Sequence, residues 1–356
     1  MAIAPKGFFS DQNRTDAAPK RHRESTFAFL DRVAGLYWEQ VRNLIEKWVA
    51  KLPDSAHPDI TGRLRAKDDV QYRSAYWELY LHETFIRSDF EVKIHPDIPG
   101  SSGQPDFLVK RDGESFYVEA KCLFPEPLDL SAEARKHTLY EYLNAIRCPE
   151  FLLWIDVHQV GPDNLQVKAL RNELQKWVTE VDPAAIACDN DYRERGPRFP
   201  WSEAGWELEF RPFIPVDAQG GAGSHRPLGA FGPPSVTYPE DGLRLRADLM
   251  NKGSAYGDLN LPLVIAINSF THRHDDSDVM SALYGSEQIT FSLEDRDASP
   301  ALSRKPDGYW RKGSWEHQHV AGVLMGRSIL DYQPTSIPTF WTHPEAHRNV
   351  SPLPIW

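Results

Sequence analysis

Hydrophobic positions in the first part of the chain repeat with the period of a helix. Apolar residues recur at steps of three and four over residues 30–48, which predicts one face of a long helix that ends at Pro53. A second helix is predicted over residues 70–87, with Asp68 or Asp69 as its N-cap. Because this second segment is apolar on nearly every side, we expect the helix to be largely buried.

From residue 90 the hydrophobic period shortens to that of a strand. Residues 90–94 alternate, and residues 95–103 have the proline and glycine content of a loop. Two apolar runs at 107–110 and 115–119 flank an Asp-Gly turn, which predicts a β-hairpin.

The rest of the chain continues as an alternation of helices and strands. The pattern predicts helices at about 131–147, 167–181 and 243–251, and strands at 151–157, 206–210, 261–268 and 320–325. The tail from residue 332 combines proline with aromatic residues, so we expect irregular, extended chain there. Together these elements predict an α/β protein.

Composition narrows the class of protein without naming a function. Hydrophobic residues make up 41% and charged residues 26% of the chain, which excludes disordered and fibrous proteins. The net charge of -11 excludes a wholly basic nucleic-acid surface, although it allows a local basic groove or a metal ion between acidic groups. The longest apolar run, residues 261–267, is too short to span a membrane, and three widely spaced cysteines suggest no disulfide framework. We therefore expect a cytoplasmic protein.

Residues 104–121 contain the candidate chemistry. Asp106 stands at the start of one predicted strand, and Glu119 and Lys121 stand two residues apart near the end of its hairpin partner. Side chains two residues apart on a strand point to the same face of the sheet. The hairpin therefore places Asp106 beside both Glu119 and Lys121. Two converging carboxylates need a cation between them, and oxygen ligands favour Mg²⁺. The lysine can hold an attacking water or neutralise the transition state of phosphodiester hydrolysis.

These residues resemble the PD-(D/E)XK, or restriction-endonuclease-like, nuclease superfamily. Pro105-Asp106 is similar to the PD element and Glu119-Ala120-Lys121 to the (D/E)XK element. The predicted order of helix, three strands, helix and strand over residues 68–158 also resembles the common core of that superfamily. The resemblance implies a magnesium-dependent nuclease, with Mn²⁺ as a substitute, in which Asp106 and Glu119 bind the metal and Lys121 is the catalytic lysine. Ala120, between the last two, joins the implied metal site.

Members of the superfamily often add an acidic residue from the first core helix, which here means Glu78 or Glu83. The helical wheel favours Glu83 as the more buried of the two, whereas the distance from Glu78 to the first strand resembles the family pattern. We select Glu78 as the further metal ligand. Asp97 is a rival for Asp106, but its neighbouring prolines favour a turn residue. Residues 271–278, rich in His and Asp, are a weaker candidate for a second metal site and are more typical of a solvated loop.

The resemblance also implies an organisation and a set of partners. We expect a flexible arm at 1–25, a helix and linker at 26–67, a nuclease core at 68–158, and an α/β extension with a proline-rich tail at 159–356. The core would be a mixed central sheet flanked by helices. The implied substrate is DNA, in restriction, phage defence or repair, and a homodimer would supply a second site for cutting both strands. There are two alternatives: a nuclease of the same fold that cleaves RNA, or a non-catalytic protein that binds nucleic acid or another protein.

Overall fold

The computed structural model describes the chain in two compact units. It describes all residues except 1–6, 22, 99–102, 125–129, 149–150, 184–185, 187–195, 214–227, 233–240, 254–258, 272–275, 291–300, 312, 334–335 and 354–356. Unit 1 comprises Met1–Pro19, Ser25–Pro125 and Pro239–Trp356, and unit 2 comprises Lys20–Glu24 and Glu126–Tyr238. Most of unit 2 is therefore inserted into the sequence of unit 1.

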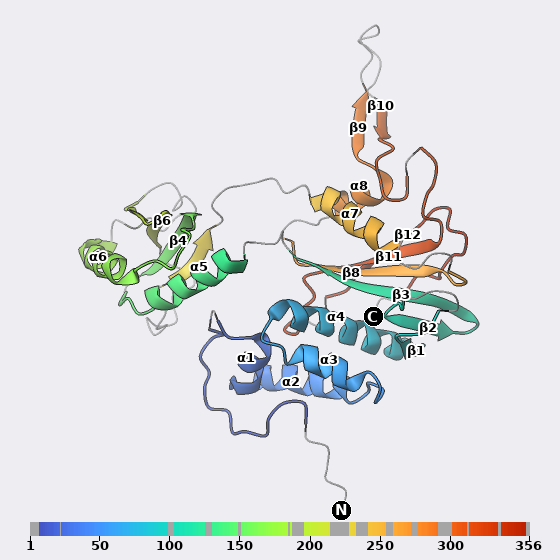
Figure 1. Ribbon diagram of the computed structural model, residues 1–356, viewed down its shortest axis with the longest axis horizontal. Coiled ribbons are helices and arrows are strands. Elements are labelled where there is room, and N and C mark those ends of the chain that lie inside the picture. Colours follow the sequence, from blue (N-terminus) through green and yellow to red (C-terminus); the bar gives the residue numbers. More distant parts are fainter. Residues whose placement is uncertain are drawn as a thin grey trace, which may run out of the picture. The chain divides into compact units, whose positions relative to one another are not determined.

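A mixed sheet forms the centre of unit 1, with the strand order β1-β2-β3-β8-β11-β12 (Figure 1). The first three strands are an antiparallel meander, and β8 then pairs parallel to both β3 and β11. The last strand, β12, pairs antiparallel to β11. The strands are β1 (Glu91–Ile94), β2 (Phe107–Arg111), β3 (Glu114–Leu123), β8 (Leu263–Ser269), β11 (Val320–Arg327) and β12 (Thr339–Thr342).

Helices cover both faces of this sheet (Figure 1). On one face lies α4 (Asp69–Arg87). Against α4, on its far side from the sheet, pack α1 (Thr26–Arg32), α2 (Leu36–Val49) and α3 (His57–Leu64). On the other face of the sheet lie α7 (Asp241–Gly253) and α8 (Asp276–Tyr284). Alternation along β3 supplies both cores, because Phe116 and Val118 pack on the α4 side whereas Tyr117 packs with Leu245 of α7. The prediction that the helix at 70–87 is buried is confirmed: Asp68 caps α4, and most of the helix is covered.

The described part of the N-terminal segment is not the flexible arm that the sequence suggested. Phe8 and Phe9 are buried, and their backbone N–H groups donate to the Glu46 carboxylate of α2 at 2.9 and 2.7 Å. Two adjacent aromatic residues in a polar segment have no periodicity, so the pattern could not reveal their burial. The long helix predicted over 30–48 is divided into α1 and α2 at Gly35, whose φ of 117° is the left-handed region that glycine tolerates.

Unit 2 consists of a sheet and two helices. Its strands β5 (Phe199–Glu203), β6 (Trp206–Phe213), β4 (Leu152–Gln159) and β7 (Leu228–Gly232) form a sheet in that order. Two helices, α5 (Leu130–Leu143) and α6 (Val167–Glu180), share one core with this sheet. A further ribbon, β9 (Glu287–Thr290) with β10 (Ala301–Arg304), belongs to unit 1.

The prediction of a continuous core over 68–158 is wrong. The helix and strand expected to complete it, α5 and β4, lie in unit 2. In the central sheet the strand beside β3 is β8, and the helix that precedes it in the chain is α7. A short apolar run such as 151–157 has the same pattern in any buried sheet, so the sequence could not decide which sheet it joins.

No described helix combines the length and the apolar character needed to cross a membrane. Cys122 is buried, and burial raises the pKa of its thiol to about 12, which favours the protonated thiol at neutral pH. Cys188 lies outside the described residues.

The buried His82 of α4 predicts a pH-dependent stability. Burial lowers its pKa from 6.5 to about 4; Glu83 opposes this decrease and Lys51 adds to it. The unfolded chain therefore binds a proton at a higher pH than the folded chain, and stability falls as the pH drops below about 6.5. Between pH 7 and pH 5 we expect His82 to account for a loss of roughly 1 to 2 kcal/mol.

Urea unfolding of the wild type and of His82→Leu at both pH values measures this loss. The variant should show a smaller decrease in the free energy of unfolding, whereas the exposed control His347→Leu should behave like the wild type. An equal decrease in wild type and His82→Leu would show that other groups cause the pH dependence.

Candidate metal centre

The pairing of β1, β2 and β3 brings three polar residues into one row at a sheet edge. Ile94 pairs with Phe107, and Phe107 pairs with Val118. One residue further toward the edge of the sheet, the same pairing places His95, Asp106 and Glu119 side by side on the three strands.

Two hydrogen bonds hold this row together. The backbone N–H of His95 donates to the Asp106 carbonyl at 2.9 Å. The backbone N–H of Ala120 donates to Oδ2 of Asp106 at 2.6 Å. The Asp106 carboxylate is thereby fixed against β3, beside the Glu119-Ala120-Lys121 segment, where the predicted hairpin puts it.

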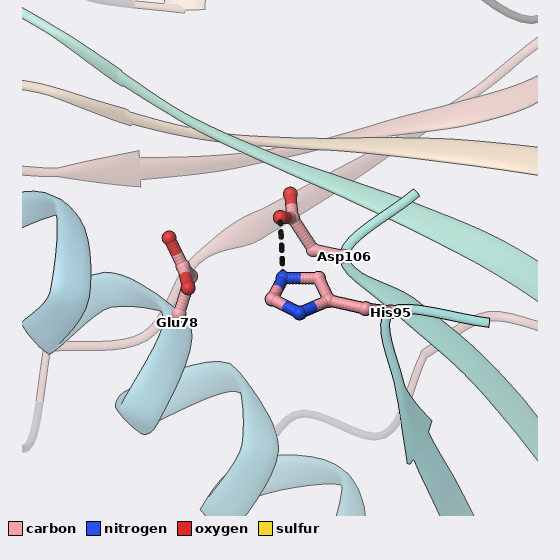
Figure 2. Close-up of side chains that lie close together, drawn as sticks. All are labelled: Glu78, His95 and Asp106. Carbon is pink, nitrogen blue, oxygen red and sulfur yellow. Dashed lines mark ion pairs between the residues drawn. The ribbon is translucent and has the colours of Figure 1, made fainter. Parts of the chain in front are cut away.

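Glu78, His95 and Asp106 converge at this edge (Figure 2). Each offers one ligand atom, and these atoms all lie within 4.8 Å of one another. Nε2 of His95 lies 3.8 Å from Oδ1 of Asp106, and Glu78 reaches them from α4. Two carboxylates and an imidazole are metal-ligating groups, so this set can hold a metal ion. It is the one such group of three or more among the residues that the structure describes.

The Glu78 carboxylate is already paired with Arg63 of α3. The guanidinium donates to both carboxylate oxygens, at 2.7 and 2.6 Å, and also to Asp59 one helical turn away. The hydrogen bond to Glu78 is the main cause that raises the pKa of Arg63 above its ordinary value. A carboxylate has about four lone-pair positions, so this pairing leaves acceptor capacity for a metal ion.

Glu83 is excluded from this centre. It is buried, as the helical wheel predicted, but its carboxylate accepts hydrogen bonds from Lys51 and Arg87. Of the two acidic candidates in α4, only Glu78 joins His95 and Asp106.

Glu119 and Lys121 lie on the opposite side of the sheet from the α4 core. Both occupy odd positions of β3, on the face where Tyr117 packs with helix α7. Glu119 is 4% exposed and is not a member of the group formed by Glu78, His95 and Asp106. Nζ of Lys121 lies 3.8 Å from Oδ1 of Asp248 in α7. The lysine therefore has an acidic neighbour outside the motif.

Three residues at or near this centre were not identified from the sequence: Arg63, His95 and Asp248. His95 had a usable signal, because it directly follows a predicted strand and a count of the meander register places it opposite Asp106. Arg63 and Asp248 had none, since each reaches its partner, Glu78 or Lys121, from a helix whose packing is set by the tertiary fold.

The weaker candidates lie elsewhere. Asp97 accepts a hydrogen bond from Gln104 at 2.7 Å within the loop before β2, in agreement with its expected place in a loop. In the His- and Asp-rich segment 271–278, residues 272–275 lie outside the described part of the chain.

Comparisons with known proteins give no relative: no family model, no curated protein and no solved structure matches this chain.

The Arg63–Glu78 pair should contribute measurably to stability in the absence of metal. Glu78 is largely buried, so removing the guanidinium leaves an uncompensated charge. A double-mutant cycle with Arg63→Met and Glu78→Gln, measured by urea unfolding with a chelator present, should give a coupling energy of about 1 to 2 kcal/mol.

The pair between Arg63 and Asp59 is the matched control, because Asp59 is 54% exposed. A cycle with Asp59→Asn should give less than about 0.5 kcal/mol. Equal coupling in both cycles would contradict a special role for Glu78.

Proposed function

We propose that this chain is a divalent-metal-dependent nuclease built on a restriction-endonuclease-like core. The observation that carries the proposal is the hydrogen bond from the Ala120 backbone to Asp106, because it ties the Pro-Asp element to the Glu-Ala-Lys element across one hairpin. The two halves of the motif are separated by twelve residues in sequence but are neighbours in the fold.

The order of elements in unit 1 supports the proposal. Helix α4 is followed by the β1-β2-β3 meander, then by α7, and then by β8 parallel to β3. This order agrees with the helix, three strands, helix and strand that the resemblance implies, with unit 2 inserted between β3 and α7. The proposed core therefore comprises residues from 69–123 and 241–269, and the segments around it would shape substrate choice.

Carboxylate oxygens suit a divalent ion such as Mg²⁺ or Mn²⁺. Asp106 and Glu78, whose ligand atoms converge, would hold it. Glu119 and the carbonyl oxygen of Ala120, which the resemblance implies as further ligands, lie beside Asp106 on β3 but outside this group. A bound ion of this kind polarises a phosphate oxygen and lowers the pKa of a coordinated water.

The protein's own residues supply the remaining parts of the proposed reaction. Lys121 is half-exposed, so its ammonium can hold a water in line with phosphorus or stabilise the charge of the transition state. Asp248 would act as a positioning residue that orients this ammonium. The backbone of Ala120 keeps the Asp106 carboxylate oriented toward β3.

DNA is the proposed substrate, and a homodimer would provide the two sites that cleavage of both strands requires. The proposed setting is the cytoplasm, in restriction, phage defence or repair.

The proposal predicts a specific pattern of lost activity. Supercoiled plasmid, single-stranded DNA and RNA are each incubated with the protein and Mn²⁺. We expect nicking of the plasmid by wild type, and a decrease of at least about 100-fold for Glu119→Gln and Lys121→Ala. The first variant loses a proposed metal ligand, and the second loses the ammonium that stabilises charge at the phosphate.

Two exposed residues of the same meander are matched controls: Glu91→Gln on β1 and Lys110→Ala on β2. Both should retain wild-type activity. Equal activity in the wild type and all four variants would refute the assignment, and cleavage of RNA alone would change the substrate.

Asp248 provides a second test of the same reaction. If it orients Lys121, Asp248→Asn should lower kcat about tenfold with little change in KM, and Asp248→Glu should restore part of the loss, since it returns the negative charge. A loss that appears only in KM would assign Asp248 to substrate binding.

Arg246 offers a control for this test on the same helix. It stands two residues before Asp248 in α7, and its guanidinium lies 3.9 Å from Asp307. Arg246→Gln should therefore leave both kcat and KM close to the wild-type values. A tenfold lower kcat in this variant as well would mean that disturbance of α7, and not loss of the Asp248 charge, slows the reaction.

A further inference from the structure

The backbone conformation of His95 directs its side chain toward the candidate centre. It follows β1 directly, its φ of 44° lies in the left-handed region, and its N–H is bonded to Asp106. Non-glycine residues adopt such a backbone at an energetic cost, and such positions cluster at functional sites. The result is an imidazole that faces the carboxylates of Asp106 and Glu78 (Figure 2).

The separations fit a shared ion after small side-chain rotations. In a six-coordinate site with bonds of about 2.1 Å, neighbouring ligand atoms are roughly 3 Å apart and opposite ones roughly 4.2 Å apart. Nε2 of His95 and Oδ1 of Asp106 are 3.8 Å apart, and Glu78 completes a set whose ligand atoms lie within 4.8 Å. Shifts of less than about 1 Å at the ends of these side chains bring the three atoms to octahedral spacing.

The chemistry of the ligands decides which ion is favoured. Mg²⁺ prefers oxygen and gives up its water reluctantly, whereas first-row transition metals accept imidazole nitrogen readily. Arg63 offsets the charge of Glu78, which weakens the electrostatic attraction for either divalent ion. The imidazole nitrogen is therefore the ligand that distinguishes the two ions.

We infer that His95 is a metal ligand and that, together with Glu78 and Asp106, it makes this centre selective for a transition-metal ion such as Mn²⁺ over Mg²⁺. This deepens the proposed function, on which it rests, by naming the class of ion, but metal binding can be measured without any nucleic acid. The two proposals can therefore fail separately.

Calorimetric titration of the full chain with Mn²⁺ alone and with Mg²⁺ alone tests the selectivity. Wild type should bind Mn²⁺ at least about tenfold more tightly than Mg²⁺. His95→Ala should weaken Mn²⁺ binding at least about tenfold and change Mg²⁺ binding less than about threefold. The matched control is His347→Ala, an exposed histidine of the same unit, which should leave both affinities unchanged.

Pulsed electron paramagnetic resonance of bound Mn²⁺ tests the coordination itself. Wild type and His347→Ala should show the modulation from a coordinated imidazole nitrogen, and His95→Ala should lack it. The His95 side chain is 42% exposed, so its removal should not unfold the chain, which circular dichroism checks.

Three results would overturn the inference: no nitrogen modulation in wild type, equal affinity of wild type for the two ions, or equal weakening of both by His95→Ala. The last result would mean that His95 only orients Asp106 and does not bind the ion itself. Nitrogen coordination without cleavage of any nucleic acid would retain this inference and reject the proposed function.

Discussion

The register of the β1-β2-β3 meander is the constraint on which the candidate centre depends. A shift of one residue in either pairing would move every side chain of a strand to the other face. It would also separate His95, Asp106 and Glu119, which now share one row because Ile94, Phe107 and Val118 do. On the α4 side Phe107 and Val118 are buried, and Ile94 is partly buried against the same core. Core packing therefore determines the placement of the polar edge.

Around this edge, charged groups are matched with groups of opposite charge from neighbouring helices. Arg63 of α3 pairs with Glu78, and Asp248 of α7 lies near Lys121. The two pairs lie on opposite faces of the sheet, so each helical layer contributes one charged residue to the region of Asp106. The overall charge of -11 does not reveal this arrangement, because local pairing and not net charge controls the chemistry of a site.

The sequence was sufficient for local structure and insufficient for the assembly of sheets. The helix α4 and the hairpin β2-β3 follow from periodicity and from the Asp-Gly turn, and the hairpin alone places Asp106 beside Ala120. The partner of β3 could not be predicted, because β4 and β8 are both short apolar strands and nothing local distinguishes them. The same limit applies to the centre: Arg63 and Asp248 depend on the packing of α3 and α7, which periodicity does not specify.

The insertion of unit 2 has a consequence for the order in which the chain folds. Tyr117 of β3 pairs with Leu263 of β8, so the central sheet closes only after the whole of unit 2 has left the ribosome. Unit 2 has a core of its own and can condense meanwhile. During that interval β3 is an open strand edge, and exposed edges of this kind are templates for aggregation. Because loop closure costs only about 0.6 kcal/mol more per doubling of length, the insertion delays the sheet much more than it destabilises it.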